Sequence, residues 1–277
     1  MTVSFEIFSD LWVQYGEGPV WSESGNCIWW VDIPGCRLLR TDAVTGRTDA
    51  WNTPETPGCI AVRADGMLVV GLVSGIFLFD PVSGRFEHAC SPESRDDVRF
   101  NDGASDAAGR FWTGTMHLAA ARPAGAIFCI EPDFTYRRIF EDLWIPNGLA
   151  FDQSRNRMYF SDSHPSVQTI WVCDYDVLTG TPVNRRTFAT THALEGRPDG
   201  AFVDDDGVYW IAAVEGSQLL RFAPTGEALE PLPVPVSHPT KIVMDRKNPP
   251  TLYVTTRRMA PDDETDPSGY LLRGTFS

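Results

Sequence analysis

The sequence is poor in lysine and has no cluster of basic residues. Lys241 and Lys247 are the only lysines among 23 lysines and arginines, while 37 Asp and Glu residues give the 277-residue chain a formal net charge of -14. A nucleic-acid-binding surface needs concentrated positive charge, so this composition argues against a nucleic-acid partner. Small molecules or cations are more plausible binding partners for a chain with this negative net charge.

Long apolar runs are also absent. The longest are only as long as a strand, so none could span a bilayer and no membrane association is expected. The opening text MTVSFEIFSD lacks the basic start and the apolar stretch of a secretory signal, which predicts a cytoplasmic location. The six cysteines include no C-x-x-C pair, which favours reduced thiols over disulfides.

The sequence does contain a unit that is repeated six times. A short turn followed by an aromatic or aliphatic strand recurs at intervals of about 40 to 50 residues. No stretch has an apolar period of about 3.6 residues, so few helices are expected. The residues that anchor the six strands are Trp29, Leu68, Phe111, Tyr159, Tyr209 and Leu252.

This period predicts an all-β fold, a six-bladed β-propeller that forms a single domain over residues 1–277. An irregular β-sandwich is the alternative, but a sandwich gives no reason for such a repeat. The last unit ends at Phe276 with little sequence left for an outer strand. We therefore expect residues 3–9 to supply the outermost strand of the last blade and close the ring. A closed propeller has no need to dimerise for stability, so we expect a monomer.

The segment upstream of each anchor strand is expected to be innermost and to face the central channel. Four of these segments place a polar residue before glycine at matching positions: Glu17, Asn101 with Asp102, Asn147 and Asp199. Such short sequences also form ordinary turns, but turns alone do not explain why they occur at matching positions in different blades. Carboxylate and amide oxygens without imidazole or thiolate favour a hard divalent cation in the channel.

Four stretches together resemble the regucalcin/gluconolactonase family of six-bladed propellers. They are YGEGPVW, RFNDG followed by GRFWTGTM, IPNGLAF followed by YFSDS, and RPDGAFVDDDGVYW, in this order over nearly the whole chain. The resemblance implies one divalent metal ion held by Glu17, Asn147 and Asp199, with Arg99 and Asn101 lining the substrate cavity. Calcium is the metal we expect, with zinc, manganese or magnesium as alternatives. The resemblance also implies hydrolysis of sugar lactones, with Asp199 as the candidate base.

The chain departs from the family pattern in two places. After GTM, many relatives carry an acidic residue two or three positions on, whereas this chain has His117-Leu118-Ala119-Ala120. His117 is therefore a candidate substrate-binding residue, although a lone histidine is more often structural. Arg257 and Arg258 stand where relatives often have small residues; they could bind an anionic group of the substrate or simply be solvated.

The predicted function is a metal-dependent hydrolase that opens a sugar lactone to the aldonic acid in carbohydrate catabolism. A divalent cation stabilises the charge that develops on the carbonyl oxygen, and Asp199 could take the proton from water. Two alternatives stay open. The same cation could serve an organophosphate or acyl-homoserine lactone hydrolase, or the ring could be a non-catalytic calcium-binding propeller.

Overall fold

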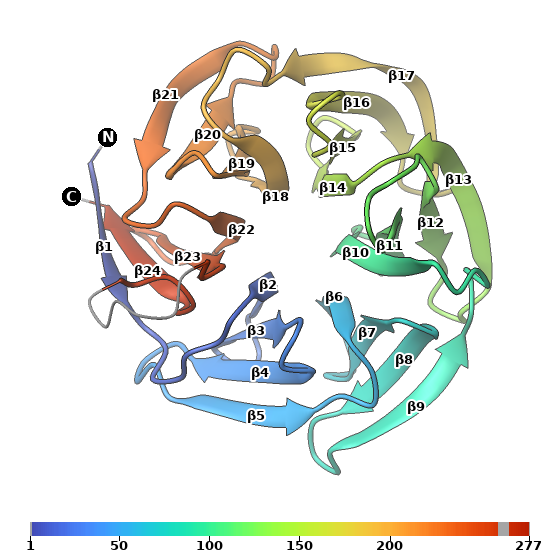
Figure 1. Ribbon diagram of the computed structural model, residues 1–277, viewed down its shortest axis with the longest axis horizontal. Coiled ribbons are helices and arrows are strands. Elements are labelled where there is room, and N and C mark those ends of the chain that lie inside the picture. Colours follow the sequence, from blue (N-terminus) through green and yellow to red (C-terminus); the bar gives the residue numbers. More distant parts are fainter. Residues whose placement is uncertain (1, 260–265, 277) are drawn as a thin grey trace.

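The computed structural model describes residues 2–259 and 266–276. These residues form strands and no helix, and the strands make six four-stranded antiparallel sheets around a common centre (Figure 1). The predicted six-bladed propeller is confirmed. Since the described residues contain no helix, none is available to cross a membrane.

Each blade runs from an innermost strand at the centre to an outermost strand at the rim (Figure 1). In blades 1 to 6 the innermost strands are β2 (Gly16–Ser22), β6 (Pro57–Val62), β10 (Val98–Ser105), β14 (Pro146–Asp152), β18 (Arg197–Val203) and β22 (Pro239–Met244). The second strands are β3 (Cys27–Asp32), β7 (Leu68–Leu72), β11 (Phe111–His117), β15 (Arg157–Asp162), β19 (Tyr209–Val214) and β23 (Thr251–Thr256). The third strands are β4 (Arg37–Asp42), β8 (Gly75–Asp80), β12 (Gly125–Ile130), β16 (Thr169–Asp176), β20 (Gln218–Phe222) and β24 (Leu272–Phe276). The outermost strands are β5 (Thr48–Asn52), β9 (Arg85–Cys90), β13 (Tyr136–Leu143), β17 (Thr181–Thr190), β21 (Ala228–Pro233) and, in blade 6, β1 (Val3–Ile7).

Blade 6 joins the two ends of the chain. Strand β1 pairs antiparallel with β24, so that Val3 lies opposite Phe276 and Ile7 opposite Leu272. Figure 1 shows the two chain ends side by side at this blade. Strand β24 is thereby paired on both of its edges, which leaves it no open edge toward solvent.

The hydrophobic core lies between neighbouring blades. Every residue of β3 is buried, whereas every residue of β17 at the rim is partly or fully exposed. One cluster packs Trp29 and Val31 of blade 1 against Val70 and Phe79 of blade 2. Fully burying side chains of this size contributes about 1.5 to 3 kcal/mol each. All six cysteines are free thiols, as their spacing predicted.

All six innermost strands carry a β-bulge at the same place. Pairing with the second strand shifts register at Glu17/Val20, Pro57/Cys59, Phe100/Gly103, Asn147/Ala150, Pro198/Ala201 and Pro239/Lys241. A bulge leaves a residue out of the ladder and redirects its side chain. The bulges of blades 1 and 4 contain Gly18 and Gly148 at φ 57° and 62°, a conformation that glycine adopts without strain. In four blades the polar residue before glycine lies at this bulge, whereas blades 2 and 6 form the bulge without such a pair.

Candidate metal and substrate site

The three predicted metal ligands lie in the bulges of blades 1, 4 and 5. Glu17, Asn147 and Asp199 expose only 9%, 4% and 5% of their surface. Burial, and then the charge of Asp102, raises the pKa of Glu17 to about 7. Burial raises the pKa of Asp199 well above its usual range, and the Glu17 carboxylate raises it further. The two carboxylates therefore lie within electrostatic reach of each other although 182 positions of sequence numbering separate them.

Hydrogen bonds fix the orientation of the Asn147 side chain. Its Nδ2 donates to Ser163 Oγ at 2.7 Å, and its Oδ1 accepts from Asn101 Nδ2 at 3.0 Å. Ser163 Oγ in turn donates to the carbonyl of Pro198, the residue before Asp199. An amide oxygen has two lone pairs, so Asn147 Oδ1 keeps one for a further partner.

These side chains fit a hard divalent cation. No hydrogen bond to the Asp199 carboxylate occurs among the residues that the structure describes, and Glu17 Oε2 accepts one, from the Gly18 N–H at 2.9 Å. Two buried carboxylates that few donors satisfy need a compensating positive charge. Over residues 2–259 and 266–276, no three His, Cys, Asp or Glu side chains gather as a metal cluster. A cation bound by Glu17 and Asp199 would therefore take its third protein ligand from an amide such as Asn147.

The two predicted substrate residues of blade 3 lie beside these groups. Asn101 Nδ2 donates to the carbonyl of Pro146 at 3.1 Å as well as to Asn147. The Arg99 guanidinium donates to the carbonyl of Phe100 at 2.9 Å, and its charge lowers the pKa of Glu17 against the larger effect of burial. Asn101 thus orients a candidate ligand, and Arg99 carries a positive charge close to Glu17.

His117, at the end of β11, is held by its own loop. Its Nδ1 accepts from the N–H of Ala119 at 3.1 Å and of Ala121 at 3.4 Å. Its Nε2 lies 3.7 Å from Asp97 Oδ2. These contacts give His117 a part in ordering the loop after β11, and its role in substrate binding stays a prediction.

A second charged layer lies one residue further along the innermost strands. Lys241 of blade 6 donates to Asp102 Oδ1 of blade 3 at 2.5 Å, and both side chains are at least 95% buried. Asp102 also accepts from the N–H groups of Gly103 and Leu149, each at 2.8 Å. Blades 3 and 6 are opposite each other in the ring (Figure 1). This ion pair therefore crosses the central channel.

Sequence analysis did not single out Ser163 or Tyr15, and it did not predict that Lys241 pairs with an acid. Ser163 follows Asp162 in the quoted text YFSDS, and Tyr15 opens YGEGPVW, so both lay within the stretches that carry the family resemblance. Lys241 carried the clearest signal, because one of only two lysines sits in an innermost strand that has no other charged residue. A lysine at that position needs a buried acid nearby.

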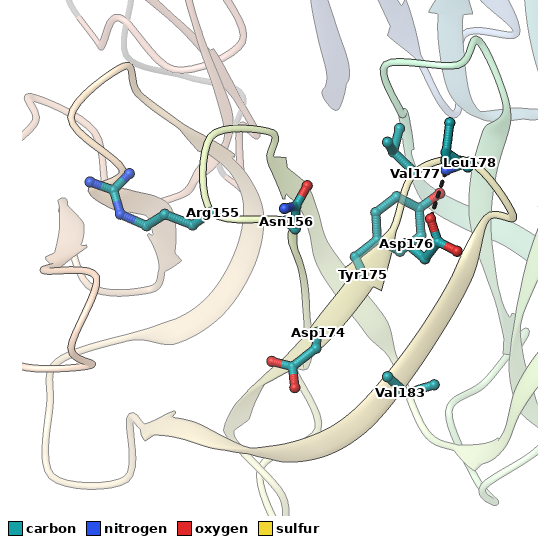
Figure 2. Close-up of a pocket in the computed structure, with 8 residues that line it drawn as sticks. All are labelled: Arg155, Asn156, Asp174, Tyr175, Asp176, Val177, Leu178 and Val183. Carbon is teal, nitrogen blue, oxygen red and sulfur yellow. Dashed lines mark hydrogen bonds between the residues drawn. The ribbon is translucent and has the colours of Figure 1, made fainter.

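Figure 2 shows a groove on blade 4 that does not include the predicted site residues. The charged side chains that line this groove already have partners. Asp176 accepts from the Leu178 N–H at 2.9 Å, and Asp174 forms an ion pair with Arg186 at 2.9 Å. The groove is lined by Arg155, Asn156, Asp174, Tyr175, Asp176, Val177, Leu178 and Val183.

The chain belongs to the family described as SMP-30/Gluconolactonase/LRE-like region, whose model matches residues 15–258. The resemblance seen in the four sequence stretches is thereby confirmed. The protein is a six-bladed β-propeller of this family.

Several named proteins are similar to it over most of their length. A 6-deoxy-6-sulfogluconolactonase of Pseudomonas putida is 36% identical over 88% of this chain and 83% of its own. An L-arabinolactonase of Azospirillum brasilense is 34% identical over 90% and 83%, and a regucalcin of Danio rerio is 31% identical over 91% and 85%.

Solved structures agree on the fold. A regucalcin of Agrobacterium tumefaciens, described as a calcium-binding protein, superposes with a TM-score of 0.91 at 24% identity, covering 99% of this chain and 93% of its own. A gluconolactonase of Xanthomonas campestris gives 0.81 at 22% identity, covering 98% and 89%.

Proposed function

We propose that this protein is a metal-dependent lactonase that opens a sugar lactone to the corresponding aldonic acid. The observation that supports the proposal is that the bulges of blades 1, 4 and 5 carry two buried carboxylates, which affect each other electrostatically, and one amide oxygen whose orientation is fixed. Two relatives more than 30% identical are named as lactonases of sugar substrates, which supports the substrate class.

Glu17, Asn147 and Asp199 would hold the cation, for which we propose calcium, with zinc, manganese or magnesium as alternatives. Oxygen ligands without imidazole or thiolate support calcium. When bound, the cation would supply positive charge for the carbonyl oxygen that becomes negative during attack. We further propose that the pairing of β1 with β24 closes the ring and that residues 1–277 form one domain, because the ligands must be held from three separate blades.

The reaction joins a water oxygen to the lactone carbonyl carbon and breaks the bond from that carbon to the ring oxygen. Asp199 takes the proton of the attacking water and returns it to the ring oxygen as that oxygen leaves, which yields a hydroxy acid. Arg99 and Asn101 donate hydrogen bonds to the substrate and orient it.

The test is an assay of a panel of sugar lactones with and without calcium, with the uncatalysed rate subtracted. We expect turnover that a chelator abolishes, and a kcat about 100- to 10,000-fold lower in Asp199→Asn. The control is Asp205→Asn, which changes an exposed carboxylate in the β18–β19 turn. Full lactone hydrolysis by Asp199→Asn would contradict the mechanism. Calcium binding without hydrolysis of any lactone would favour a non-catalytic calcium-binding propeller instead.

A further inference from the structure

Three arginines lie around the candidate site, and they differ in their partners. Arg197, at the start of β18, is neutralised by Glu215 through two hydrogen bonds of 2.7 and 3.1 Å. Within the part of the chain that the structure describes, neither Arg99 nor Arg257 forms an ion pair with a carboxylate. Arg99 donates to a backbone carbonyl, and Arg257 lies over an aromatic ring.

Arg257 is attached to the site through Tyr15. Its guanidinium lies 4.7 Å from the centre of the Tyr15 ring, and the two residues form an isolated β-bridge. Its backbone N–H donates to the carbonyl of His238 at 2.9 Å. Tyr15 precedes Glu17 by two residues. Arg257 therefore contacts a residue that lies two positions from the candidate ligand Glu17.

Arg99 lies in β10 of blade 3 and Arg257 directly follows β23 of blade 6, so the two arginines come from opposite blades (Figure 1). Both are partly buried. A neutral sugar needs hydrogen-bond donors but no net positive charge, and Asn101 already provides a donor. An anion would be repelled by Glu17 and Asp199, and by a chain with a net charge of -14, unless cations stood beside its binding position. Arginine matches such groups because its planar fork binds two oxygens at once.

We propose that Arg257, with Arg99 on the opposite side of the channel, binds an anionic group carried by the lactone at the end remote from its reacting carbonyl. The shared chemistry is a phosphate, sulfonate or carboxylate substituent. Arg257 is a specificity residue and takes no part in breaking the ester bond. The inference rests on the proposed lactonase function and narrows its substrate class.

The experiment compares kcat/KM for glucono-1,5-lactone with kcat/KM for lactones that carry a phosphate, a sulfonate or a carboxylate at C6. We expect at least one anionic lactone to be preferred about tenfold or more. In Arg257→Ala that preference should fall about 10- to 100-fold, the worth of a charge-assisted contact, while the neutral lactone changes less than about threefold. Arg257→Lys should retain part of the preference, because an ammonium keeps the charge without the fork.

The matched control is Arg47→Ala, which removes an exposed arginine paired with Asp49 in blade 1 and so changes the total charge equally. It should leave the preference unchanged. A preference for the phosphate over the sulfonate and the carboxylate would indicate that the arginines select a dianion. Equal preference for the three lactones would indicate that any anionic group is bound. Equal turnover of neutral and anionic lactones, or an equal loss on both in Arg257→Ala, would overturn the proposal.

A second readout keeps this inference separate from the proposed function. If no lactone is hydrolysed, the proposed function fails, and binding of the product acids then tests Arg257. We would measure thermal shifts with gluconate and 6-phosphogluconate in wild type and Arg257→Ala. Stabilisation by the phosphorylated acid, lost in the variant, would support anion binding. Shifts that are the same in wild type and Arg257→Ala would reject it.

Discussion

The central channel contains two polar layers built on the same bulge, and they differ in how their charge is balanced. One layer holds Glu17, Asn147 and Asp199, whose two carboxylates form no ion pair among the described residues although they are buried. The next holds Asp102, which is balanced by Lys241 and by two backbone N–H groups. The same β-bulge can therefore have two different roles. Where it presents acids alone it forms a candidate ligand site, and where it presents an acid to a lysine it forms an ion pair across the ring.

The largest effect is expected from removing both charges of the first layer. The variant Glu17→Gln/Asp199→Asn should move the calcium Kd beyond about 1 mM, the weak end of natural calcium sites. The same variant should raise the Tm of the metal-free protein, because two buried charges that repel each other are gone. Calorimetric titration and thermal unfolding measure these opposite changes. Unchanged calcium binding would show that the cation is held elsewhere.

Breaking the second layer should cost stability. Lys241→Met leaves the Asp102 charge buried and unpaired, which should lower the free energy of unfolding by about 3 to 5 kcal/mol. Lys241→Met/Asp102→Asn should recover most of this loss, because the asparagine side-chain oxygen can still accept a backbone N–H. Urea unfolding of the two variants and the wild type gives the comparison. If the free energy of unfolding of Lys241→Met lies within about 1 kcal/mol of the wild-type value, the ion pair across the ring is dispensable for stability.

The path of the lysine across the channel can be tested at Gly200. A Cβ at this position would overlap the stem of the Lys241 side chain. Gly200→Ala should therefore destabilise the protein by about 1 to 3 kcal/mol. In a Lys241→Gly background the same change should cost much less, because the overlapping Cβ, Cγ and Cδ atoms of Lys241 are all absent. A penalty of equal size in both backgrounds would mean that Gly200 is required for another reason.

The support of Asn147 should affect metal affinity more than folding. Ser163→Ala removes the acceptor of Asn147 Nδ2 and lets the amide rotate. We expect calcium affinity to fall about tenfold, the lower end of the effect of residues that orient metal ligands. Calcium titration measures this. Ser154→Ala, at a serine in the β14–β15 turn that bonds Asp152, is the matched control and should not alter affinity.

The smallest effect is expected at the ion pair between Arg197 and Glu215. The hydrogen bond from Arg197 lowers the pKa of Glu215. The stability that this pair contributes should be present above the ordinary glutamate pKa and lost as the pH falls through the lowered value. It should be at most about 1 kcal/mol, because the pair is partly exposed. Wild type and Glu215→Gln should therefore differ at neutral pH and converge in acid. A constant difference across the range would exclude titration of Glu215 as its cause.

Sequence analysis predicted the features that depend on residues close together along the chain. The repeat located the innermost and second strands of all six blades, because turn residues and apolar strands mark each unit directly. It also marked Glu17, Asn147 and Asp199 as equivalent, because the glycine after each polar residue reflects a backbone constraint. Their roles as ligands, and that of His117 as a substrate contact, stay predictions.

The sequence by itself determined the number of blades, the order of strands and the positions at which oxygen-bearing side chains enter the channel. Only the tertiary structure decided that Lys241 meets Asp102 across the ring, that Ser163 orients Asn147, and that the Arg257 guanidinium lies over the Tyr15 ring. The physical reason is that strand pattern and turn chemistry depend on neighbours along the chain. Pairing between blades depends on which side chains the closed ring brings to one point.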